Sequence, residues 1–164
     1  MKITSGLLSA FLFVSLSSAA FAAPKTSKLY GFKGKYTGSV NYGGVAGGST
    51  TGSIRASKTK DVGTITLTSL LSLGGTTGVL TETISIQKRT ASYVLQIAGT
   101  AGIGSGSVSV SKSTITYTVP FSAAGQSYSV TGTITKTKKG LNILETISGN
   151  TNFAISYALR RSGK

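Results

Sequence analysis

Cysteine, histidine and tryptophan are absent from this chain of 164 residues, and the only acidic residues are Asp61, Glu82 and Glu145. Without Cys or His, the usual ligand sets for zinc, haem, copper and iron-sulfur clusters cannot form, and neither can a Ser-His-Asp or Cys-His nucleophile. The three carboxylates also fall short of the oxygen cage that a calcium ion needs. We therefore expect no metal, no cofactor and no enzymatic activity.

Small residues and positive charge dominate what is present. The chain has 25 Ser, 24 Thr and 22 Gly, and its 17 Lys and Arg residues give a formal net charge of +14. Such an excess of one sign attracts partners of the opposite sign. The composition therefore indicates contact with an anionic polymer or an anionic cell surface.

The first 22 residues have the pattern of a secretory signal peptide. Met1 and Lys2 precede an apolar stretch over residues 7–16, and Ala20-Phe21-Ala22 is a small-x-small cleavage motif. The stretch is too short and too rich in serine for a transmembrane helix. We therefore expect an exported protein, periplasmic or extracellular, which folds without disulfides because it has no cysteine.

From Lys33 onward, apolar and polar residues alternate with a period of two, and β-branched or aromatic residues fill the apolar positions. This pattern is typical of half-buried β-strands. The predicted strands are 33–42, 51–59, 62–73, 79–88, 92–98, 106–112, 114–121, 127–137, 141–148 and 152–160. We expect a single domain over 33–161, preceded by a flexible basic segment over 23–32 and followed by a basic tail over 162–164.

Every connection between these strands is short enough for a hairpin. Residues 99–106 are rich in glycine, but no helix follows them, so we interpret them as a hairpin connection rather than a phosphate-binding loop. Strands joined only by hairpins form an antiparallel up-and-down meander, and a meander of about ten strands usually closes into a barrel to remove its edges. The sequence therefore predicts an all-β barrel, with a two-sheet β-sandwich as the alternative.

Strand parity separates the two faces of this sheet. One face carries the aliphatic residues and most of the tyrosines, and the other is mainly Ser and Thr. The apolar face of a soluble barrel points inward, so buried phenol groups there need hydrogen-bond partners. Two acids share this parity. The predicted interior polar residues are Glu82, Glu145, Tyr36, Tyr93, Tyr117, Tyr128 and Tyr157.

A carboxylate on a buried face is costly unless it is paired. In one interpretation, Glu82 and Glu145 make structural contacts with tyrosine hydroxyls or with an inward Lys or Arg, for which the candidates are Lys58, Lys136 and Arg161. In the other, they are polar anchors of a cavity that binds a small ligand. A glycosidase with paired carboxylates is disfavoured, because no substrate cleft is marked.

The two glutamates also stand in matching contexts. Glu82-Thr83-Ile84-Ser85 and Glu145-Thr146-Ile147-Ser148 each follow a Gly-Thr-Ile-Thr segment, at 63–66 and at 132–135. An internal duplication of about five strands would explain this, and so would chance matching in a chain of such biased composition.

Positive charge is expected to collect at one end of the barrel. Turns of a meander alternate between the two ends, and the turns after even-numbered strands hold the basic residues, while the glycine-rich turns after odd-numbered strands hold no charge. The predicted anion-binding rim is Lys58, Lys60, Lys88, Arg89, Lys112, Lys136, Lys138, Lys139, Arg160 and Arg161. Lysine at strand ends also protects edges and aids solubility, which is the simpler interpretation.

Together these patterns predict an exported, monomeric, non-enzymatic β-barrel binding protein. Its basic rim would contact anionic surfaces or polyanions, and its interior would offer a site for a small molecule. Sequence-specific nucleic-acid binding is not expected, because strand parity turns the aromatic residues inward. Two alternatives remain, which are an outer-membrane β-barrel and a structural secreted protein with no ligand.

Overall fold

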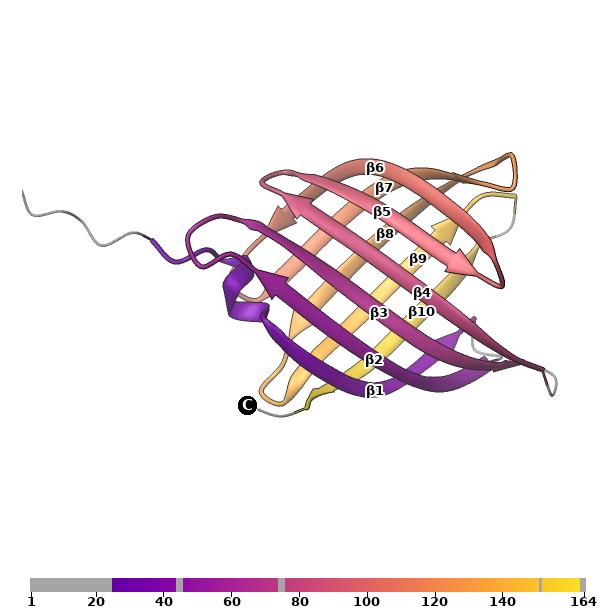
Figure 1. Ribbon diagram of the computed structural model, residues 1–164, viewed down its shortest axis with the longest axis horizontal. Coiled ribbons are helices and arrows are strands. Elements are labelled where there is room, and N and C mark those ends of the chain that lie inside the picture. The colour runs from indigo at the N-terminus through magenta and orange to yellow at the C-terminus, as the bar shows by residue number, and fades with distance from the viewer. Residues whose placement is uncertain (1–24, 44–45, 74–75, 151, 163–164) are drawn as a thin grey trace, which may run out of the picture.

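A closed barrel of ten antiparallel strands makes up the computed structural model, which describes residues 25–43, 46–73, 76–150 and 152–162 (Figure 1). The strands are β1 (Gly34–Tyr42), β2 (Ala46–Ala56), β3 (Val62–Leu73), β4 (Thr76–Gln87), β5 (Thr90–Ile97), β6 (Thr100–Val110), β7 (Thr114–Ala123), β8 (Gln126–Lys136), β9 (Gly140–Ser148) and β10 (Phe153–Arg161). The expected signal peptide over 1–22 and residues 163–164 of the basic tail lie outside the described residues.

Consecutive strands pair with each other, and β1 also pairs with β10, which closes the ring. At this seam the partners run from Tyr36 opposite Arg161 to Tyr42 opposite Ile155. The predicted up-and-down barrel is thus confirmed, and the β-sandwich alternative is not the fold. Among the described residues, no helical segment has the length and apolar character to cross a bilayer.

Two strands begin at least five residues earlier than the sequence pattern predicts. The strand expected at 106–112 starts at Thr100, and the strand expected at 51–59 starts at Ala46. The glycine-rich stretch 99–106, expected to be a connection, is therefore mostly strand β6. Glycine makes room there, since a Cβ on Gly102 would lie 2.8 Å from the ring of Phe121 on β7.

The apolar face of every strand points into the barrel, as parity predicts. Ile65, Ile84, Ile134 and Ile143 have no exposed surface, and neighbouring inward positions are filled by other aliphatic and aromatic side chains. Each such burial contributes about 1.5–3 kcal/mol of hydrophobic stabilisation. Ser and Thr occupy most of the outward positions between them.

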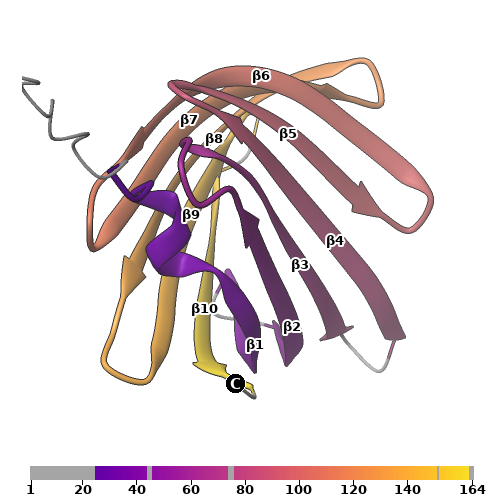
Figure 2. The ribbon, with the colours of Figure 1, turned by 60° about the vertical axis from the view of Figure 1, so that its left-hand side comes forward.

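A short 3-10 helix, η1 (Leu29–Phe32), precedes the barrel and lies across the end where β1 begins (Figure 2). The side chains of Leu29 and Phe32 are fully buried, and the Tyr36 hydroxyl donates a hydrogen bond of 2.5 Å to the Phe32 carbonyl oxygen. We expected residues 23–32 to be flexible, but within this segment residues 29–32 are packed, because two apolar side chains cover the open end of the core.

Asp61, in the turn between β2 and β3, fixes the segment before η1. Its Oδ1 atom accepts a hydrogen bond of 2.7 Å from the Ser27 hydroxyl and another from the Leu29 backbone amide. The first of these contacts is the main reason that the pKa of Asp61 is lowered. The third acid of the chain therefore holds the N-terminal segment against the barrel end.

Candidate functional site

A cluster of hydrogen-bonded polar side chains lies inside the apolar interior. The Tyr93 hydroxyl donates to Glu82 Oε1 at 2.8 Å, and the Tyr157 hydroxyl donates to Glu82 Oε2 at 2.5 Å. The Tyr117 hydroxyl donates to Glu145 Oε1. Both carboxyl groups are almost completely buried, with 1% and 2% of their residue surface exposed. Tyrosine hydroxyls are thus the partners that the structure gives to both acids.

Gly132 makes the contact between Tyr117 and Glu145 geometrically feasible. Tyr117 on β7 lies opposite Gly132 on β8, and Gly132 lies opposite Glu145 on β9. A Cβ on Gly132 would lie 2.1 Å from the Tyr117 Cζ atom, so the ring lies over the glycine. The phenol group can then reach a strand that is not its neighbour. Sequence reasoning missed this role, although the Gly-Thr-Ile-Thr segment pointed to the position.

Burial sets the protonation of this cluster. Desolvation raises the pKa of Glu145 well above 4.5, and the charge of Glu82 raises it further. Desolvation also raises the pKa of Glu82, but hydrogen bonds from Tyr157 and Tyr93 oppose that shift. Of the two acids, Glu145 is therefore the one that its surroundings favour more strongly in the neutral form. Its Oε1 accepts from Tyr117, whereas its Oε2 is buried with no hydrogen-bond partner of suitable geometry among the described residues.

The tyrosines themselves stay protonated and act as donors. Burial, followed by the nearby glutamates, raises the pKa of Tyr93, Tyr117 and Tyr157 far above the usual value of 10.0. The cluster also extends sideways, because the Ser69 hydroxyl hydrogen-bonds with Tyr157 and lies 2.8 Å from the Thr50 hydroxyl, and both Thr50 and Ser69 are buried. This arrangement links β2, β3, β4, β5 and β10 through polar contacts inside the core.

Two of the predicted interior tyrosines do not join the cluster. Tyr36 is buried at the end covered by η1. Tyr128 is half-buried at the opposite end, where its ring stacks on Phe121 with 5.4 Å between centroids. The cations proposed as alternative partners, Lys136 and Arg161 among them, have exposed side chains at the end covered by η1.

The matching contexts of the glutamates correspond to opposite positions in the barrel. β4 and β9 are five strands apart in a ring of ten, so Glu82 and Glu145 approach from opposite walls. The correspondence continues on the next strands, where Ser92-Tyr93-Val94-Leu95 of β5 matches Ser156-Tyr157-Ala158-Leu159 of β10. Both of these tyrosines donate to Glu82, so the cluster itself is not symmetric.

The basic residues gather at the end covered by η1, which we call the basic rim. They lie in the turns β2–β3, β4–β5, β6–β7 and β8–β9 and at the end of β10, and their side chains are exposed. The basic rim consists of Lys58, Lys60, Lys88, Arg89, Lys112, Lys136, Lys138, Lys139, Arg160 and Arg161. The connections at the other end, residues 43–45, 74–75, 98–99, 124–125 and 149–152, contain no charged residue in the sequence. We call that end the neutral end.

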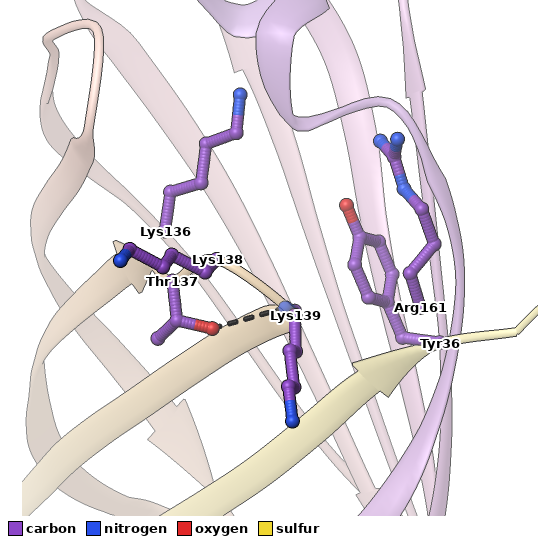
Figure 3. Close-up of a pocket in the computed structure, with 7 residues that line it drawn as sticks. Tyr36, Lys136, Thr137, Lys138, Lys139 and Arg161 are labelled. Atoms are coloured by element: carbon purple, nitrogen blue, oxygen red, sulfur yellow. Dashed lines mark hydrogen bonds between the residues drawn. The ribbon is translucent and has the colours of Figure 1, made fainter.

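A pocket of about 100 Å³ is set into the basic rim (Figure 3). It is lined by Tyr36, Lys136, Thr137, Lys138, Lys139, Gly140 and Arg161. Figure 3 shows the Lys136 and Arg161 side chains extending to the same side, whereas Lys139 extends the opposite way. The Arg161 guanidinium lies over the Tyr36 ring, 5.8 Å from its centroid, and donates to the Lys33 carbonyl oxygen.

A second pocket, of about 200 Å³, opens at the neutral end. It is lined by Leu95, Ile97, Thr100, Phe121, Ala123, Ala124, Tyr128, Ile147 and Phe153. Below it, the Phe121 ring contacts Tyr93, with 5.4 Å between centroids, so the pocket leads toward the polar cluster. Sequence reasoning did not identify this pocket, because apolar residues near strand ends follow the same pattern as the core.

In the part of the chain that the structure describes, no three acidic side chains come together as a metal site would require. Compared with models of protein families, with curated proteins and with solved structures, this chain gives no match.

Proposed function

We propose that this protein is an exported, non-enzymatic β-barrel binding protein whose basic rim attaches it to an anionic polymer or an anionic cell surface. The observation that carries the proposal is the separation of charge, with exposed Lys and Arg at one end and uncharged turns at the other. Solubility alone needs net charge but does not need it on one end. A polyanion contact does, because it depends on a local positive potential.

The distribution of polar and apolar residues between the outer and inner faces of the barrel supports a protein surrounded by water. An outer-membrane barrel presents an apolar band to lipid, about 25 Å tall. Here the outward positions are mainly Ser and Thr, and most of the large apolar residues are inside, with isolated exceptions such as Ile103 and Leu144. The buried position of Glu82 and Glu145 supports a structural role for these acids over glycoside hydrolysis, which needs carboxyl groups at an open substrate site.

Affinity for immobilised heparin, measured as the salt concentration needed for elution, tests the proposed contact. The variant Lys112→Gln/Lys138→Gln removes two rim charges, and the matched variant Gln96→Glu/Gln126→Glu lowers the net charge equally on exposed positions near the neutral end. We expect elution of the wild type to require high salt, the rim variant to elute clearly earlier, and the matched variant to elute close to the wild type.

Two results would contradict this function. Equal shifts for both variants would mean that net charge alone acts, without a rim. A wild type that elutes at about 0.15 M salt or below, where charges are already screened over about 8 Å, would leave a structural secreted protein with no ligand.

A second function is favoured by the pocket at the neutral end, which has the predominantly apolar lining of a small-molecule site. We propose a neutral, apolar ligand there, because no charged residue lies in the turns of that end. A neutral naphthylamine dye should gain fluorescence with the wild type. The substitution Ala123→Leu, which fills the pocket, should abolish the gain, and the exposed control Ala101→Leu should keep it. A gain that survives Ala123→Leu would refute this site.

A further inference from the structure

We propose that the pocket in the basic rim binds one tetrahedral oxyanion group, a phosphate or sulfate monoester, between Lys136 and Arg161. This inference rests on the proposed function and names the chemical group that the rim selects. Its basis is the position of these two side chains on the same side of a pocket that η1 adjoins (Figure 3).

The charges around the pocket are of one sign. Three lysines and one arginine line it, and no acidic residue is among its lining residues. The single acid at this end, Asp61, accepts hydrogen bonds from Ser27 and from the Leu29 amide. A bound anion would therefore meet cations that have no carboxylate in the same pocket to compete for them.

Arg161 is held in place before any ligand arrives. Its guanidinium lies over the Tyr36 ring and donates one hydrogen bond to the Lys33 carbonyl oxygen. A guanidinium carries five donors in a planar fork, so further donors remain for two oxygens of one anion. Because the ring and the carbonyl already orient it, little side-chain entropy is lost when the anion binds.

Lys136, the last residue of β8, supplies the second cation. Its ammonium lies 3.7 Å from the position that a Cβ on Gly31 would take, so the side chain reaches over the barrel end to η1. Thr137 adds a hydroxyl. Its Oγ1 accepts a 2.9 Å hydrogen bond from the Gly140 amide, and its own proton can donate into the pocket. Donors thus line the pocket from β8, from the β8–β9 turn and from β10.

The size of the pocket limits what enters. A volume of about 100 Å³ is smaller than the roughly 150 Å³ of a cavity that holds a benzene ring, so it suits a single tetrahedral group better than a sugar ring or a base. A tetrahedral monoester offers three terminal oxygens to donors arriving from several directions, whereas a carboxylate offers two oxygens in one plane. The pocket should therefore distinguish phosphorylated or sulfated polymers from carboxylated ones.

Two double variants of equal net charge test the inference. Lys136→Gln/Arg161→Gln removes the cations that share one side of the pocket, and Lys88→Gln/Arg89→Gln removes the same charge from the β4–β5 turn, whose residues do not line the pocket. Inorganic phosphate, sulfate and acetate are titrated while the backbone amide resonances of Gly31 and Gly140 are followed by NMR. Heparin, polyphosphate and alginate are compared as polymers that carry sulfate, phosphate and carboxylate.

The wild type should saturate with phosphate or sulfate and show no saturable shift with acetate. The pocket variant should bind the free ions at least about tenfold more weakly, as expected for the loss of charge-assisted hydrogen bonds. The turn variant should keep that affinity and lose only part of its polymer binding. Saturation with phosphate but not sulfate, or the reverse, identifies the group that the polymer must carry.

Equal losses in the two double variants, or no saturable binding of either ion, would overturn the inference even if heparin still binds. A wild type that binds none of the polymers would instead overturn the proposed function. Because Arg161 also contacts Tyr36, the single variant Lys136→Gln is measured in parallel. It should weaken phosphate or sulfate binding while its unfolding midpoint stays that of the wild type, and unchanged ion binding would also refute the site.

Discussion

The two ends of this barrel are built from the same kind of hairpin and yet differ in what closes them. At the basic end, η1 places Leu29 and Phe32 over the core, and both are completely buried. At the neutral end, Tyr128 and Phe153 are half-buried around an open pocket. The difference arises from a segment that precedes the barrel rather than from the strands. The ten-strand meander therefore forms the core, whereas an end of the barrel is covered only where another segment of the chain packs against it.

The same substitution made at each end gives the sharpest comparison. Phe32→Ala should lower the free energy of unfolding by about 3–5 kcal/mol, because it empties a fully buried position. Phe153→Ala should cost only about 1–2 kcal/mol, because the ring is half-buried and contacts Tyr42 in a tilted arrangement with 5.0 Å between ring centroids. Urea denaturation of both variants measures the two values. Equal costs would mean that η1 does not seal its end.

Alkaline pH should destabilise the protein through the buried polar cluster that lies between the two ends. Glu145 has a raised pKa, so ionising it in the folded state is unfavourable, and stability should fall as pH rises from the usual value of 4.5 toward the raised one. Glu145→Gln keeps an acceptor for Tyr117 and carries no charge. At about pH 5 we expect this variant to lie within about 1 kcal/mol of the wild type, and at about pH 9 to be the more stable protein.

Urea unfolding at these two pH values measures the change in stability. The exposed control Gln87→Glu should show the same dependence of stability on pH as the wild type. A wild type whose stability does not change between these pH values would contradict a raised pKa of Glu145 in the folded protein.

Acidic pH should weaken the contact between the N-terminal segment and the basic end. Of the predicted stability changes, this one should be the smallest. The pKa of Asp61 is lowered, so its contribution is present above the usual value of 3.8 and is lost as pH falls through the lowered value. Asp61→Asn keeps an oxygen acceptor but loses the charge, at a cost of roughly 0.5–1 kcal/mol at neutral pH. Hydrogen exchange of the Leu29 amide should speed up in the variant, and exchange at the neutral end should not.

Much of this architecture can be predicted from a period of two. Alternation located ten strands, and parity turned Ile65, Ile84 and Glu82 inward, because a strand has only two faces. Turn alternation then separated the basic rim from the neutral end. These are local rules, and they need no knowledge of which strands face each other across the barrel.

Strand alternation and parity could not predict which side chains contact each other across the barrel. Tyr157 on β10 reaches Glu82 on β4, and Tyr117 reaches past Gly132 to Glu145. Strand tilt and the space above one glycine decide these pairings, and neither leaves a periodic signal. Leu29 and Phe32 escaped detection for a related reason, since two apolar residues in a four-residue helix are too few to show a period.

The seam between β1 and β10 bears on how the molecule forms. Every other pair of neighbouring strands is joined by a short turn, but this pair joins the two ends of the domain, and Ser162 donates to the Lys35 carbonyl oxygen beside it. Closing so long a loop is entropically the most expensive contact in the chain, so it should form last. Until β10 pairs with β1, the two outer strands have unpaired edges. The chain is then an open antiparallel sheet of hairpins rather than a closed barrel.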